Sequence, residues 1–115
     1  MLREVFILDR YVKKIYDLLY SPIVTPYNLL ENAKLQNYSY VNFYKGQEGL
    51  VAEMKCLMED LEEAIFYYHF DTEDKLLKIF MEKEGFCKAL MFDRIQELEK
   101  TKKDYLTGNK KDIAV

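Results

Sequence analysis

Hydrophobic residues in the first twenty positions recur at the spacing of an α-helix. They stand three or four residues apart, with charged residues mostly between them: Val5, Leu8, Val12, Ile15 and Leu19. Pro22 ends this pattern, because proline disfavours the helical conformation in the residue before it. We therefore predict an amphipathic helix over residues 2–20.

Two further helices are indicated by their start and stop signals. Thr25 can cap a helix that begins with Pro26 and buries Leu29, Leu30 and Leu35, which predicts a short helix over residues 26–35. Near the C-terminus, Asp93 and Gln96 have the spacing of a capping box. Gly108 supplies a stop signal, so we predict a helix over residues 94–106.

The segment between residues 38 and 93 allows two interpretations. In the first it is an antiparallel meander with strands at 39–45, 50–58, 64–70, 76–82 and 86–92, separated by turn-forming segments such as 46–49 and 84–85. In the second, residues 48–68 form one helix, because the stretch from Ala52 to Ala64 is rich in good helix formers. We favour the meander, since Glu84-Gly85 lies between two apolar runs and glycine accepts a positive φ.

The predicted fold class is α+β, with an N-terminal helix, a four- to five-stranded antiparallel meander and a C-terminal helix. The alternative is an all-α helical bundle. No linker rich in Pro, Gly or Ser divides the 115 residues. We therefore predict a single globular domain over residues 1–106, followed by a frayed tail over residues 107–115.

Composition and charge narrow the functional classes. The net charge of −3 and the absence of a basic face argue against nucleic-acid binding. No apolar run reaches the length of a membrane span or a signal peptide, so we expect no membrane association and a cytoplasmic protein. Cys56 and Cys87 are too few for a disulfide framework, and we expect both to be buried thiols.

The residues that could carry chemistry do not form a convincing catalytic or metal site. If a turn centred on Leu61 joins the second and third strands, Cys56 faces Phe66 while His69 faces Glu53, so Cys56 and His69 project from opposite faces. His69, Asp71, Glu73 and Asp74 have the spacing of an acidic turn and lack the pattern of a calcium loop. We expect no enzyme activity, no metal and no cofactor.

The strongest functional indication is an excess of aromatic residues. The chain contains 10 Tyr and 7 Phe, and alternation places several large apolar residues on the sheet face that points away from the main core. The candidate partner-binding surface consists of five residues: Tyr40, Tyr44, Ile65, Tyr67 and Phe80. Either the terminal helices cover this face, or it binds a protein partner or a second copy in a homodimer.

We therefore expect a small non-enzymatic interaction protein that acts through protein–protein contacts or self-association. The alternative is a small-molecule-binding or weakly enzymatic domain with a pocket near His69. The two hypotheses differ in whether the tyrosines lie on an open face or converge on a concave pocket.

Overall fold

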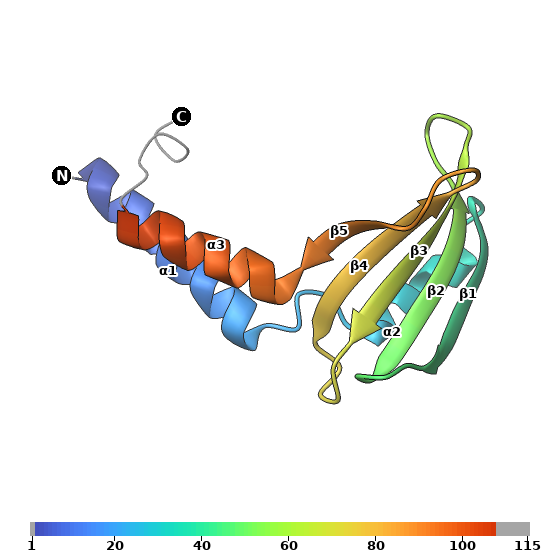
Figure 1. Cartoon of the computed structure of the whole chain (residues 1–115), viewed down its shortest axis with the longest axis horizontal. Helices are drawn as coiled ribbons and strands as arrows, with labels where there is room; N and C mark the ends of the chain where they lie inside the picture. The colour runs from blue at the N-terminus through green and yellow to red at the C-terminus, as the bar shows by residue number, and fades with distance from the viewer. Residues whose placement is uncertain (1, 108–115) are drawn as a thin grey trace. The chain divides into compact units, whose positions relative to one another are not determined.

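A computed structural model describes the backbone of residues 2–107 and the side chains of residues 10–107 (Figure 1). The chain forms two compact units. One contains the helices α1 (Leu2–Tyr20) and α3 (Arg94–Thr107), and the other comprises Pro22–Asp93. That the two units act as one domain stays a prediction. Of the predicted tail, Thr107 is the last residue of α3, and 108–115 lie outside the described residues.

The larger unit is an antiparallel meander, which confirms the α+β prediction and excludes the helical bundle. Its strands are β1 (Tyr38–Lys45), β2 (Leu50–Leu57), β3 (Glu63–Phe70), β4 (Leu76–Lys83) and β5 (Ala89–Asp93). They lie side by side in sequence order, so β1 and β5 form the two edges (Figure 1). The segment with helix-forming composition becomes β2 and β3, because alternating burial outweighs local propensity there.

Tight turns set the register of the strands. The amide of Gly46 donates to the carbonyl of Gly49 at 2.7 Å and closes the β1–β2 turn. The β2–β3 turn is closed by the Met58 amide, which donates to the Glu62 carbonyl at 2.9 Å, and Leu61 adopts a φ of 65° within it. The turn is thus centred on Asp60 rather than Leu61, and the predicted register was wrong: Cys56 pairs with Ala64, and His69 pairs with Val51.

The core of this unit lies between one face of the sheet and a short helical segment. Helix α2 (Pro26–Leu30) continues into a 3₁₀ turn, η1 (Glu31–Lys34), so the predicted helix over 26–35 is confirmed in its start and shortened in its regular part. Thr25 caps α2 through a reciprocal pair of hydrogen bonds with Asn28. Five buried residues form the centre of the core: Leu29, Ala52, Met54, Phe70 and Leu76.

The smaller unit is an antiparallel helix pair. Lys14 forms an ion pair of 2.8 Å with Glu97, and one guanidinium nitrogen of Arg94 donates to the Leu18 carbonyl at 2.6 Å near the C-terminus of α1. This donor satisfies a carbonyl at a helix end, where the negative end of the helix dipole favours a cation. The predicted apolar stripe was only partly right, because Leu18 is buried whereas Val12 is exposed by 55%.

No described helix is long and apolar enough to cross a membrane. The compartment of the protein stays a prediction.

Candidate functional site

The structure brings the five candidate residues together on one face of the sheet. Tyr40 and Tyr44 lie on β1, Ile65 and Tyr67 on β3, and Phe80 on β4. We call these five residues the aromatic face. A register shift between Tyr38 and Tyr40 lets Tyr38 pack on the core while Tyr40 points to the aromatic face. Within residues 22–93, Leu29 of α2 and Asn32 of η1 contact the core side, so the aromatic face carries no helix of its own unit.

Two glutamates on this face accept hydrogen bonds from its tyrosines. The Tyr40 hydroxyl donates to Glu53 at 2.8 Å, and the Tyr44 hydroxyl donates to the same carboxylate at 3.5 Å. The Tyr67 hydroxyl donates to Glu82 at 3.3 Å. Alternation along β2 predicts Glu53 on this face, but its role as hydrogen-bond acceptor for two tyrosines was not predicted. The carboxylates hold the tyrosine rings in place and keep spare acceptor sites among the apolar side chains of this face.

These contacts hold the tyrosine hydroxyls in the protonated form. Burial raises the pKa of Tyr40 to about 12, helped by its hydrogen bond to Glu53 and the charge of that carboxylate. Burial also raises the pKa of Tyr67 to about 12, with the charges of Glu82 and Glu53 as the next causes. At neutral pH the face therefore presents neutral phenols beside carboxylates, not phenolate nucleophiles.

The five residues differ in how much surface they offer to a partner. Tyr67 is only 8% exposed, because it lies at the centre of the face and the ammonium of Lys88 sits 3.7 Å from its ring centroid. Tyr44 is 44% exposed, and the remaining three are half-buried. Tyr67 thus supports the face, while a binding partner would contact mainly the rings and the aliphatic side chain around it.

His69 lies on the same face, where its register partners are Val51 and Lys78. Its ring meets Phe80 edge-to-face with centroids 5.3 Å apart. Burial lowers the pKa of His69, and the nearby Lys88 lowers it further. Cys56 is buried on the core face, so the prediction that these two side chains project from opposite faces is confirmed. A thiol–imidazole pair between them is excluded by this geometry.

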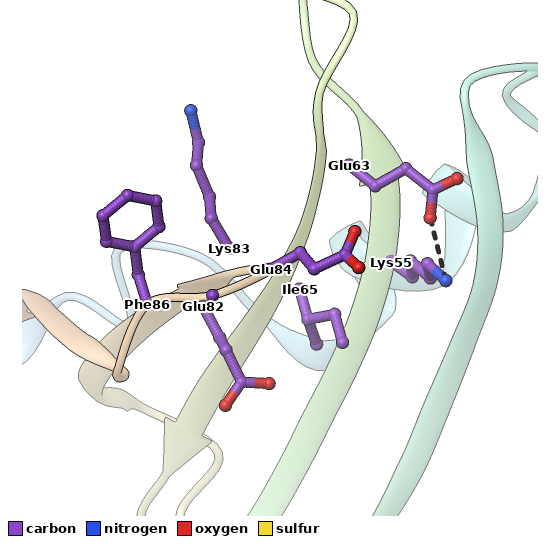
Figure 2. A pocket seen from close by; sticks show the side chains of 8 residues that line it. Lys55, Glu63, Ile65, Glu82, Lys83, Glu84 and Phe86 are labelled. Atoms are coloured by element: carbon purple, nitrogen blue, oxygen red, sulfur yellow. Dashed lines mark ion pairs between the residues drawn. The ribbon is translucent and has the colours of Figure 1, made fainter.

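A hollow of about 430 Å³ opens where β3 begins and β4 ends, beside the β4–β5 turn. Ile65 and Glu82, which are register partners, line it together with Phe86 of the β4–β5 connection (Figure 2). Lys55 and Glu63 form an ion pair of 2.8 Å at the opposite wall (Figure 2). The hollow thus continues the aromatic face and adds charged walls to it. His69, near which the alternative hypothesis placed a pocket, does not line this hollow.

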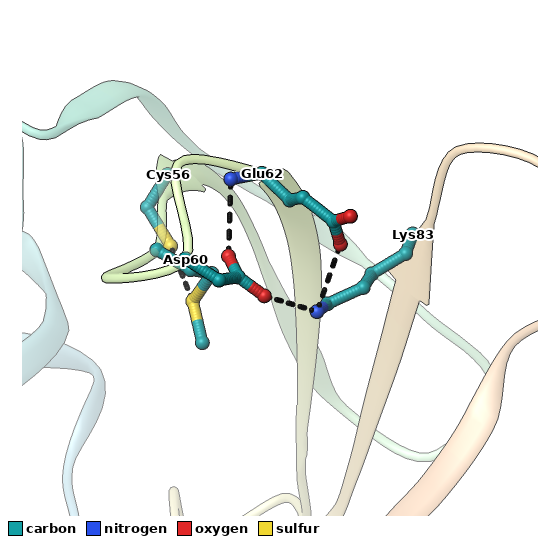
Figure 3. Close-up of polar contacts among 5 residues, drawn as sticks. Cys56, Asp60, Glu62 and Lys83 are labelled. Atoms are coloured by element: carbon teal, nitrogen blue, oxygen red, sulfur yellow. Dashed lines mark hydrogen bonds and ion pairs between the residues drawn. The ribbon is translucent and has the colours of Figure 1, made fainter.

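Three further acidic residues, Asp60, Glu62 and Asp71, hold turns of the sheet. Lys83 bridges Asp60 at 2.9 Å and Glu62 at 3.2 Å, while the Cys56 thiol lies 3.8 Å from the Met58 sulfur (Figure 3). Hydrogen bonding to Lys83 lowers the pKa of Asp60.

In the β3–β4 turn, one carboxylate oxygen of Asp71 accepts hydrogen bonds from two backbone amides, those of Glu73 at 2.8 Å and Lys75 at 3.0 Å. The acidic residues after His69 therefore form a turn in which the Asp71 side chain is bonded to the backbone amides of the turn itself. Among the described residues, no group of three or more His, Cys, Asp or Glu side chains is placed to hold a metal ion.

The second cysteine departs from the expectation. Cys87 is exposed in the β4–β5 turn, so the prediction that both thiols are buried was right for Cys56 and wrong for Cys87. The cause is the later start of β5, which begins at Ala89 rather than at residue 86 and leaves Cys87 in the connection.

Comparisons with known proteins found no matching family model, no matching curated protein and no matching solved structure.

Proposed function

We propose that this chain is a small interaction protein that binds another protein through its aromatic face. The observation that carries the proposal is the convergence of Tyr40, Tyr44, Ile65, Tyr67 and Phe80 on the side of the sheet that α2 does not cover. Tyrosine suits such a role because its ring is apolar and stiff while its hydroxyl stays hydrogen-bonded.

The chemistry of the face indicates the kind of protein surface that fits it. The rings and Ile65 favour apolar side chains at the centre of the contact. The carboxylates of Glu53 and Glu82 each accept hydrogen bonds from tyrosine and retain further lone pairs. An apolar partner surface that also carries arginine would satisfy both features, because arginine binds carboxylates and stacks on aromatic rings.

The alternative function, small-molecule binding near His69, has less support. The His69 ring packs against Phe80, and the hollow on this face lies where β3 begins and β4 ends, whereas His69 is near the end of β3. We also propose a cytoplasmic location, which rests on the two free cysteines.

The test compares face variants with a matched control for binding to proteins from the cells that encode this chain. Ile65→Lys and Phe80→Lys each place a charge on the aromatic face, whereas Val12→Lys makes the same kind of change at an exposed position of α1. We expect a protein that co-purifies with the wild type and the control and is lost with both face variants. Circular dichroism verifies that the variants fold. Equal binding by all four proteins would contradict the proposal.

A further inference from the structure

The free edge of β1 presents a row of backbone groups that are ready to pair with another strand. The Gly46–Gly49 hydrogen bond fixes the alternation of the β1–β2 ladder, in which every second residue bonds to the neighbouring strand. The residues of β1 that do not bond to β2 lie an odd number of positions before Gly46: Val41, Phe43 and Lys45. Their N–H and C=O groups therefore point away from β2. In the described part of the chain, no other strand or loop bonds to this side of residues 41–45.

Between residues 40 and 44 this edge lacks the features that usually protect a sheet from strand addition, and its one charged side chain, Lys45, lies at the end of the strand. Edge strands are commonly blunted by proline, by inward-pointing charges, by bulges or by short length. β1 has eight residues and no proline, and its register shift is confined to the end at Tyr38. The opposite edge, β5, has only five residues and a register shift within its pairing to β4. The two edges therefore differ, and β1 is the one open to pairing.

We propose that β1 pairs antiparallel with β1 of a second copy, around a two-fold axis that passes between the two Phe43 residues. In this register Phe43 faces its own symmetry mate and Val41 faces Lys45 of the other copy, so all three outward peptide groups of each chain find partners. Lys45 is the only charged side chain of residues 38–45, and the register keeps it away from its symmetry mate. The strand is thus complementary to itself in hydrogen bonding, and the register sets no like charges opposite each other.

A small, mostly apolar hollow that Phe43 of β1 helps to line, and that extends to Asp74 of the β3–β4 turn, fits the same occupant. Its volume is about 220 Å³, and Tyr27 and Leu30 of α2 line it together with Phe43 and Leu50. Tyr27 is 75% exposed and Leu30 is 53% exposed. Because Val41 and Phe43 point to the core side of the sheet, the same residues of the second copy would reach this hollow from across the edge.

This strand pairing would also affect the proposed function, although the pairing proposal does not depend on that function. An antiparallel two-fold axis of this type stands perpendicular to the sheet and leaves equivalent faces on the same side. The two aromatic faces would then form one continuous surface with two equivalent binding positions, which increases avidity for a repeated or dimeric partner.

Charged substitutions in β1, at exposed positions on the same side of the sheet as the aromatic face, distinguish this arrangement from other modes of association. In the proposed register Asn42 of one copy faces Tyr44 of the other, and both side chains are exposed. The Asn42→Lys, Tyr44→Lys variant sets like charges opposite each other twice, whereas Asn42→Lys, Tyr44→Glu sets opposite charges there.

Light scattering coupled to size-exclusion chromatography measures the result. We expect the wild type and the Lys/Glu variant to run at twice the 13.8 kDa chain mass, and the Lys/Lys variant to run as a monomer with an unchanged circular dichroism spectrum. A wild type that stays monomeric throughout a concentration series would overturn the proposal. Equal dimerisation of both variants would also overturn it, and loss of the dimer with Phe80→Lys alone would move the contact to the aromatic face.

A disulfide test checks the register itself. In a Cys87→Ser background, a chain with Asn42→Cys mixed with a chain with Tyr44→Cys should form a cross-linked heterodimer under mild oxidation. Directly opposed residues of a non-hydrogen-bonded pair lie about 4.5 Å apart between Cα atoms, which a disulfide spans. Each variant alone should cross-link poorly, because residues two positions off register are too far apart. Cross-linking that is equal in all three samples would refute the register.

Discussion

The hydrogen bond from Tyr40 to Glu53 predicts a measurable and pH-dependent contribution to stability. Tyr40→Phe removes only the hydroxyl and keeps the ring. The lost bond has a donor–acceptor distance of 2.8 Å and a charged acceptor. Bonds of this type contribute about 1.5–3 kcal/mol, and a half-buried position favours the lower end. We therefore expect Tyr40→Phe to lower the free energy of unfolding by about 1.5 kcal/mol near neutral pH.

The same variant tests the pKa of the phenol. Folding raises the pKa of Tyr40 from 10.0 to about 12, so the fold favours the protonated form. The stabilisation is fully present below pH 10 and is lost as the pH rises toward 12. Urea unfolding of both proteins across this range should show the cost of Tyr40→Phe shrinking as the pH rises. Tyr27→Phe, at a 75% exposed position, is the control. A cost near zero at neutral pH, or one that grows with pH, would refute the reasoning.

Three further predictions concern turns and thiols. Gly49→Ala should destabilise the protein by about 1–3 kcal/mol in urea unfolding, because a Cβ there would lie 2.5 Å from the Phe70 carbonyl oxygen, and an unchanged midpoint would count against this close approach. Leu61→Gly should stabilise it by about 1 kcal/mol, since Leu61 adopts a φ of 65° and is 80% exposed, whereas a loss of stability would mean that its side chain packs. A thiol reagent should label Cys87 rapidly in the native protein and Cys56 only in denaturant, and rapid labelling of both would contradict the assigned strand faces.

Much of the fold is accessible from the sequence because its local signals agree with one another. Thr25 and Pro26 start a helix where the structure has one, and Gly46 and Gly49 close a turn between two alternating strands. Alternation along the strands predicts all five residues of the aromatic face. It holds for Tyr40 because the register shift of β1 lies before this residue, and for Ile65 and Tyr67 because β3 pairs with β4 without a shift there.

Other features depend on geometry that a linear pattern does not carry. The register shift between Tyr38 and Tyr40 sends two tyrosines of the same strand parity to opposite faces. The β2–β3 turn, in which Leu61 adopts a positive φ, is centred one residue earlier than predicted. Cys56 therefore pairs with Ala64 instead of the predicted Phe66. The bonding role of Glu53 follows from the positions of two tyrosines on the adjacent strand, and sequence spacing gives no measure of that distance.

The most direct test of the aromatic face as a protein-binding surface is site-specific photo-crosslinking in the cells that encode this chain. A photoreactive phenylalanine analogue would replace Tyr44 or Phe80 on the face, or Val12 on α1 as the matched control. We expect a discrete adduct from both face positions, with one partner protein in common, and none from position 12. Adducts of equal yield from all three positions, or none from the face, would contradict it.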